Sequence, residues 1–175
     1  MKPPYEHPET WIPPIMQLCE QLGVECVVIG GLAALRWRAK PRKTMDADFV
    51  VNQLGELDKA LSEAGFSFRI LFEQDGAPYL INGTTPDGMH LDIFITSTPF
   101  EQDVLKHAIG IYASPEDVII YKLIAWRPQD RDDIKSIFES GRELDVNYIA
   151  HYAEEGGVTD RWQQALLQWG NEVSR

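Results

Sequence analysis

Two aspartates one residue apart, Asp46 and Asp48, lie in residues 44–51, where apolar and polar side chains alternate. This alternation predicts a strand that carries both carboxylates on one face. Their Cα atoms would lie roughly 6–7 Å apart, so the side chains could converge on two metal ions about 3.5–4 Å apart. Carboxylate oxygens suit Mg²⁺ or Mn²⁺, which bridge proteins to phosphate groups. The pair therefore predicts a site for a divalent metal with a phosphate-bearing substrate. Taken alone, however, two aspartates in this spacing on a strand are more often an exposed pair than a metal site.

A glycine pair precedes this strand. Residues 24–29 are almost continuously apolar and too short for a helix, which predicts a buried strand. Gly30 and Gly31 interrupt it, and good helix formers follow in residues 32–38. Glycine lets the backbone approach a ligand closely, and the N–H groups at a helix N-terminus donate to phosphate oxygens. The pair is therefore a candidate cradle for a triphosphate, although a glycine pair is more often a simple turn.

A third carboxylate is offered by residues 89–95. Leu91, Ile93 and Ile95 alternate with polar residues there, so Asp92 is expected on the polar face of a strand. Together with the first pair it would complete a three-carboxylate metal site. His90 shares this face, where a structural role is its simpler interpretation.

The remaining patterns predict the elements that position these residues. Asp75-Gly76 and Asn82-Gly83 are typical turn dipeptides between short strands, and Ser114-Pro115 predicts a helix start. Helices are expected at residues 14–22, 32–38, 54–64, 118–126 and 130–139 and, divided by Gly156-Gly157, within 146–169, and further strands at 66–72 and 78–81. The predicted class is α/β (α+β): a mixed sheet flanked by helices, with a helical C-terminal part. Residues 1–112 would form the core and residues 113–175 the helical part, packed on it as a single compact unit.

Composition limits the classes of function. The 175 residues suffice for one domain, and the net charge of −11 argues against broad nonspecific binding of nucleic acid. A membrane span is not expected, because no apolar stretch approaches about 18 residues, and the N-terminus lacks the apolar centre of a signal peptide; a cytoplasmic protein is predicted. Five of the sixteen basic residues nevertheless gather just before the aspartate pair: Arg36, Arg38, Lys40, Arg42 and Lys43. This run either attracts a polyanion or is an ordinary solvated charge run.

Taken together, the pattern Gly-Gly-x-Ala-Leu … Arg-x-Thr-x-Asp-x-Asp, with a later aspartate on a strand, resembles the nucleotidyltransferase fold shared with DNA polymerase beta. Residues 114–134 look like the helix region of the AbiEii-type nucleotidyltransferases, which carries Lys-Leu-x-Ala followed by arginine and aspartate residues. Some members of that type are toxins of toxin–antitoxin systems. The matching segments cover residues 24 to 140.

The resemblance implies a role for each matching residue. The three aspartates would bind metal and act in catalysis, and Asp92 would help to activate the attacking hydroxyl. The triphosphate would be held by Gly30, Gly31, Arg42, Thr44 and Lys122. Two alternatives remain open at this point. Lys122 could be an ordinary surface lysine, and the set Arg131, Asp132 and Asp133 could be a helix-face ion-pair set rather than a support of the site.

The implied reaction transfers a nucleoside monophosphate from a nucleoside triphosphate to an acceptor hydroxyl and releases pyrophosphate, with Mg²⁺ or Mn²⁺ as cofactor. The acceptor could be an RNA such as tRNA, a protein side chain or a small molecule such as an aminoglycoside, and a toxin-type enzyme would have an antitoxin partner. Gly31 stands where many superfamily members have serine, and the chain is shorter than many toxin members. The main alternative is a catalytically inactive nucleotide-binding or partner-binding module of the same fold. A metal-dependent phosphodiesterase would need a water-activating group that the sequence does not identify.

Overall fold

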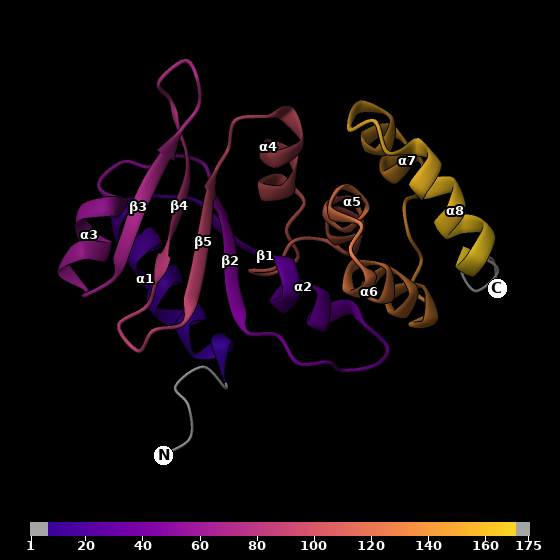
Figure 1. Cartoon of the computed structure of the whole chain (residues 1–175), viewed down its shortest axis with the longest axis horizontal. Helices are drawn as coiled ribbons and strands as arrows, with labels where there is room; N and C mark the ends of the chain where they lie inside the picture. The colour runs from indigo at the N-terminus through magenta and orange to yellow at the C-terminus, as the bar shows by residue number, and fades with distance from the viewer. Residues whose placement is uncertain (1–6, 171–175) are drawn as a thin grey trace. The chain divides into compact units, whose positions relative to one another are not determined.

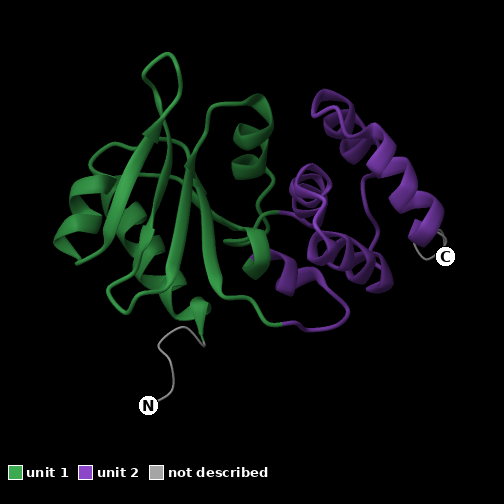
Figure 2. Ribbon diagram, in the orientation of Figure 1, with its two compact units in different colours: residues 1–32, 43–113 green, residues 33–42, 114–175 purple. Residues whose placement is uncertain are grey.

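The structure is a computed structural model that describes residues 7–170, and its chain contacts divide it into two compact units (Figure 2). The first unit comprises residues up to 32 together with 43–113, and the second comprises 33–42 and the residues from 114 onward. The elements of the first unit are η1 (Pro8–Trp11), α1 (Ile12–Leu22), β1 (Cys26–Ile29), β2 (Asp46–Val51), α3 (Leu57–Glu63), β3 (Ser67–Phe72), β4 (Pro78–Thr84), β5 (His90–Ile95) and α4 (Pro99–Lys106). Helix α2 (Gly30–Trp37) begins in this unit and continues into the second.

The first unit is built on a five-stranded mixed sheet in the order β1-β2-β5-β4-β3 (Figure 1). The central pair, β2 and β5, is parallel, whereas β1 with β2, β5 with β4 and β4 with β3 are antiparallel. The parallel pairing sets the first aspartate strand directly beside the second. The mixed sheet predicted from the sequence is confirmed.

One face of this sheet is apolar because every second residue of its central strands is apolar. Ala47, Phe49, Leu91 and Ile93 are 0–1% exposed, and they share this buried face with Ile81 of β4. Burial of such a side chain contributes roughly 1.5–3 kcal/mol. A slip of one residue in register would expose the whole set, so the pairing is strongly specified.

Two details of the sheet differ from the prediction. Strand β2 begins at Asp46 rather than at residue 44, so Met45 lies outside the strand and is 42% exposed. Asn82-Gly83 is not a turn, because both residues lie within β4. A Cβ on Gly83 would overlap the carbonyl oxygen of Ser67 and the side chain of Phe68 on β3. This glycine therefore serves the close approach of two strands rather than a turn.

Helix α4 was not predicted, although its N-terminus carries a capping box. The Thr98 hydroxyl accepts a hydrogen bond from the Glu101 backbone N–H, and the Glu101 carboxylate accepts one from the backbone N–H of Thr98. These bonds satisfy orphan donors of the first turn. The helix packs on β1 and β2.

The second unit is helical, with α5 (Pro115–Ala125), α6 (Pro128–Glu139), α7 (Val146–Glu155) and α8 (Thr159–Trp169). As predicted, Ser114 caps α5: its hydroxyl accepts a hydrogen bond from the Asp117 N–H at 3.1 Å. Gly156 and Gly157 separate α7 from α8, also as predicted. No helix within residues 7–170 has the length and apolar character needed to cross a membrane. The expected packing of the helical part on the core stays a prediction.

Candidate functional site

The pairing of β2 with β5 brings Asp48 and Asp92 side by side. The two residues are direct partners in the parallel register, and Asp46 is in the same way the partner of His90. Neighbouring strands lie about 4.8 Å apart, and paired residues point to the same face. Asp48 and Asp92 are half-buried, and Asp46, the first residue of β2, is exposed. The carboxylates thus occupy two successive rows on the face opposite the apolar one.

Gly30 lies against this row. Its preceding residue, Ile29, pairs with Asp48, and Gly30 then turns the chain from β1 directly into α2 with a φ of +64°. A Cβ at this position would overlap the Asp48 carboxylate. Only glycine lets this backbone approach the aspartate so closely. The first turn of α2, which includes Gly31, carries N–H groups that have no partner within the helix, and such groups bind anions.

The contact with Asp48 predicts that Gly30→Ala lowers the free energy of unfolding by more than backbone strain alone would. Gly23 is the matched control because its φ is +66° and a Cβ there would meet nothing within 4 Å. Gly23→Ala is expected to cost about 1–2 kcal/mol of unfolding free energy from the left-handed conformation alone. Gly30→Ala is expected to cost more, because the carboxylate must also move. Urea unfolding of both variants measures the difference, and equal losses would contradict the close contact.

The carboxylate of Asp92 is held by a neutral neighbour. Asn82 Nδ2 donates a hydrogen bond of 2.7 Å to Asp92 Oδ1, and His90 Nε2 lies 3.5 Å from Asp92 Oδ2. Asn82 was not predicted as a site residue, because Asn82-Gly83 is a typical turn dipeptide. Only a weak signal was present: Asn82 and Thr84 are polar at alternate positions, but they follow the continuously apolar residues Tyr79, Leu80 and Ile81.

These residues suit a divalent metal by their chemistry. Asp46, Asp48 and Asp92 offer only oxygen donors, the type that Mg²⁺ and Mn²⁺ prefer, and Gly30 leaves the space beside Asp48 that a side chain would fill. Within residues 7–170, no three acidic, histidine or cysteine side chains already converge as a metal-binding group. Mg²⁺ is commonly held by one or two carboxylates together with substrate phosphates, so the donor set fits a metal that arrives with its nucleotide. Thr44, which is half-buried, lies two residues before Asp46, the first residue of β2.

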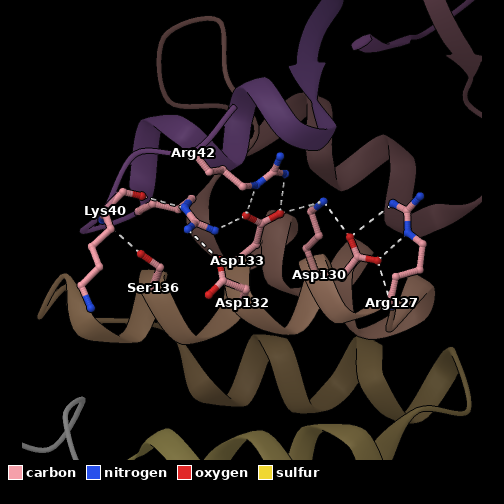
Figure 3. Close-up of polar contacts among 9 residues, drawn as sticks. Lys40, Arg42, Arg127, Asp130, Asp132, Asp133 and Ser136 are labelled. Atoms are coloured by element: carbon pink, nitrogen blue, oxygen red, sulfur yellow. Dashed lines mark hydrogen bonds and ion pairs between the residues drawn. The ribbon is translucent and has the colours of Figure 1, made fainter. Parts of the chain in front are cut away.

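Two further residues that were predicted to bind the triphosphate, Arg42 and Lys122, belong to the second unit and both contact the carboxylate of Asp133. Figure 3 shows Arg42 at this carboxylate. Asp133 is fully buried and accepts hydrogen bonds from Arg42 Nε at 2.7 Å and Arg42 Nη2 at 2.8 Å. Lys122 Nζ lies 3.0 Å from Asp133 and 2.8 Å from the equally buried Asp130. Interpreting Lys122 as a surface lysine is therefore wrong, because its side chain is only 6% exposed.

The basic run before the aspartate pair has its own partners in this unit. Arg38 donates to Asp132 at 2.8 Å and also to Asp133, and Lys40 forms an ion pair of 3.0 Å with Glu139. The Arg38 side chain is only 4% exposed. The run is therefore not simply a solvated charge run, because Arg38, Lys40 and Arg42 form ion pairs with acidic side chains of the protein.

Burial would raise the pKa of Asp133, but the hydrogen bond from Arg42 and the charges of Lys122 and Arg42 outweigh it and hold that pKa below its ordinary value. Burial would likewise raise the pKa of Asp130, but the hydrogen bonds from Arg127 and Lys122 outweigh it, so this pKa is also lowered. Both carboxylates are therefore ionised at neutral pH. This ion-pair cluster ties residues 38–42 to α5 and α6.

Comparisons with known proteins agree on the fold. The chain is similar to the antibiotic-resistance factor ANT(2'')-Ia, with 17% identity, a TM-score of 0.57 and coverage of 93% of this chain and 95% of that one. It is similar to the lincosamide antibiotic adenylyltransferase LnuA, solved with lincomycin bound, with 18% identity, a TM-score of 0.53 and coverage of 74% and 95%. It is also similar to an antigenic nucleotidyltransferase-like protein from Paracoccidioides brasiliensis, with 17% identity, a TM-score of 0.51 and coverage of 91% of each chain. No protein-family model and no curated protein matches the chain, so the resemblance to the AbiEii type stays a prediction.

Proposed function

We propose that this chain, which has the nucleotidyltransferase fold, transfers a nucleoside monophosphate from a nucleoside triphosphate to an acceptor hydroxyl and releases pyrophosphate. The observation that carries the proposal is the pairing of Asp48 with Asp92 beside the Gly30 turn. A fold alone does not fix a function, whereas the residues of a site determine its chemistry.

The proposed roles follow from position. The backbone N–H groups at Gly30 and Gly31 would donate hydrogen bonds to triphosphate oxygens, while Asp46 and Asp48 would hold the metal and Asp92 would supply a third oxygen ligand. A bound Mg²⁺ or Mn²⁺ would polarise the reacting phosphate and offset the charge on the leaving group. The acceptor oxygen forms a bond to the α-phosphorus as the bond from that phosphorus to the β-bridging oxygen breaks. Asp92 accepts the hydroxyl proton, and pyrophosphate leaves.

Thr44, Arg42 and Lys122 are the side chains that the resemblance assigns to the triphosphate. Thr44 is a neutral donor beside the strand, as the resemblance implies. Arg42 and Lys122 already neutralise buried carboxylates, so either residue would have to give up such a partner to bind a phosphate oxygen. Breaking a buried ion pair costs several kcal/mol. We therefore assign the main triphosphate contacts to the glycine turn and the metal.

For the acceptor, a small molecule with hydroxyl groups is favoured. LnuA is described as an adenylyltransferase of lincosamide antibiotics, and ANT(2'')-Ia as an antibiotic-resistance factor. Attraction of a polyanion was one of the two interpretations of the basic run, but Arg38 and Arg42 are engaged in ion pairs with aspartates. An RNA acceptor such as tRNA, or a protein acceptor with an antitoxin partner, follows instead from the AbiEii-type resemblance and forms the second arm of the acceptor screen.

Stabilisation of the protein by a nucleoside triphosphate in the presence of Mg²⁺ distinguishes a metal-dependent nucleotide site from a site that binds no nucleotide. A nucleoside triphosphate with Mg²⁺ at about 100 times its dissociation constant should stabilise the protein by about 2.7 kcal/mol. Asp46→Asn should lose most of this effect, since it removes one metal oxygen, and a chelator should abolish it in wild type. Thermal unfolding with each triphosphate, with and without Mg²⁺, measures it. Stabilisation that ignores Mg²⁺ would contradict the metal assignment, and binding without pyrophosphate release with any acceptor would favour the inactive module.

A further inference from the structure

We propose that Asn82 is a positioning residue of this site: its side-chain amide fixes the carboxylate of Asp92 in the orientation that the metal and the acceptor need. The inference rests on the proposed function and adds to it a residue that does not itself touch the metal. It is carried by the contact between Asn82 and Asp92, by the place of Asn82 in the sheet and by the charge of the groups around Asp92.

The contact comes from adjacent strands. Asn82 of β4 is the direct antiparallel partner of Asp92 on β5, so both side chains stand on the same face. Asn82 Nδ2 lies 2.7 Å from Asp92 Oδ1, a short hydrogen bond to an ionisable acceptor. The bond occupies one acceptor position of Oδ1. It leaves the remaining lone pair of Oδ1 available and does not involve Oδ2, which lies 3.5 Å from His90 Nε2.

The place of Asn82 argues against a purely structural role. Asparagine is depleted in strands, where β-branched and aromatic residues pack better. Here it lies inside a seven-residue strand, with Arg69 of β3 as its partner on the other side, and it is half-buried. The next residue, Gly83, is explained by its contact with β3, but that contact does not require an asparagine at 82. Residues whose secondary-structure preference disagrees with the element that they occupy are concentrated at functional sites.

Charge distinguishes Asp92 from the buried aspartates of the second unit. Asp130 and Asp133 are neutralised by lysine and arginine side chains, as structural carboxylates usually are. Asp92 receives a neutral amide instead, which orients the carboxylate without offsetting its negative charge. A carboxylate that must bind a cation needs this kind of support. Groups that orient metal ligands typically change affinity or activity by about 10–100-fold when they are removed.

The experiment compares wild type with Asn82→Leu, which keeps the side-chain shape but lacks the donor, and with Asn82→Val, which favours a strand. Thr84→Val is the matched control, because Thr84 lies on the same face of β4, two residues along, and pairs with His90. Mn²⁺ binding is measured by calorimetry in the presence of a nonhydrolysable triphosphate, thermal unfolding is recorded for every variant, and transfer kinetics follow. Both Asn82 variants are expected to bind Mn²⁺ about 10–100-fold more weakly and to lose kcat by a similar factor. At Mn²⁺ concentrations that saturate each variant, the KM for the triphosphate should change less than about threefold, and Thr84→Val should match wild type.

The outcomes separate the two proposals. Unchanged Mn²⁺ affinity in folded Asn82 variants would overturn the positioning role, even if their melting temperatures fall. Weaker Mn²⁺ binding in the Asn82 variants of a protein that transfers nothing would support the positioning role and overturn the proposed reaction. Failure of wild type to bind Mn²⁺ at all would overturn both. Loss of Mn²⁺ binding in Thr84→Val as well would show a general disturbance of β4 and would contradict a specific role of Asn82.

Discussion

Asp133→Asn is expected to lower the free energy of unfolding by about 3–5 kcal/mol, because it removes the charge on which three buried or half-buried cations converge. Arg42 and Lys122 would keep their positive charges in a poorly solvated place without the negative charge of Asp133, although Lys122 would still contact Asp130. The Asn82 and Gly30 variants act on the sheet, whereas this change acts on the helical unit. Urea unfolding followed by circular dichroism measures the loss.

The neighbouring residue provides the control for this prediction. Asp132 also forms an ion pair with Arg38, but its side chain is 59% exposed, so Asp132→Asn should cost no more than about 1 kcal/mol. Similar losses in the two variants would contradict the assignment of Asp133 as the centre of the cluster.

The same carboxylate should make stability sensitive to acid. The folded-state pKa of Asp133 is lowered, so its contribution is present above the ordinary value of 3.8 and is lost as pH falls through the lowered pKa. Wild type should therefore lose stability below about pH 4 more steeply than Asp133→Asn, which has no proton to gain at this position. Parallel stability curves for the two proteins between neutral pH and pH 3 would contradict the lowered pKa.

Asp48→Asn is expected to reduce nucleotidyl transfer by about 10²–10⁴-fold. Metal ions contribute several kcal/mol of transition-state stabilisation, and each 1.36 kcal/mol is a factor of ten in rate. The amide has the shape of the carboxylate, so the pairing of β2 with β5 should survive. Asp75→Asn is the control: Asp75 lies in the turn between β3 and β4, where asparagine is well tolerated, and it should keep full activity. Equal activity of Asp48→Asn and wild type would remove Asp48 from the reaction.

Much of the fold could be read from local patterns. The alternation around Phe49 and Ile93 predicted two strands, and the Ser114 cap predicted the start of α5, because these signals depend on near neighbours in the chain. Asn82-Gly83 misled the prediction because the contact that decides its structure, with Ser67 on β3, is made across the sheet. The capping box of α4, at Thr98 and Glu101, was readable but was overlooked.

The candidate site was predictable only in part. The sequence indicated which faces Asp48 and Asp92 occupy, but not that β2 and β5 are parallel neighbours in the register that pairs them. It also gave the charges of Arg42 and Asp133 without their partnership, because 91 residues separate them. Periodicity fixes the direction of a side chain, whereas pairing over such distances depends on how the whole chain packs. The roles of Gly30, Gly31 and the three aspartates stay predictions.

Transfer of a nucleoside monophosphate can be followed with nucleoside triphosphates that carry the label either at the α- or at the γ-phosphate. Purified wild type, Asp48→Asn and Asp75→Asn are incubated with Mg²⁺ or Mn²⁺ and, separately, with aminoglycosides, lincosamides, total RNA and no acceptor. We expect α-label, and no γ-label, to enter one acceptor class with release of pyrophosphate, in wild type and Asp75→Asn but not in Asp48→Asn. Label entering RNA or the protein itself would identify the acceptor class as other than a small molecule. Transfer of γ-label, or α-label transfer that persists in Asp48→Asn, would contradict the account.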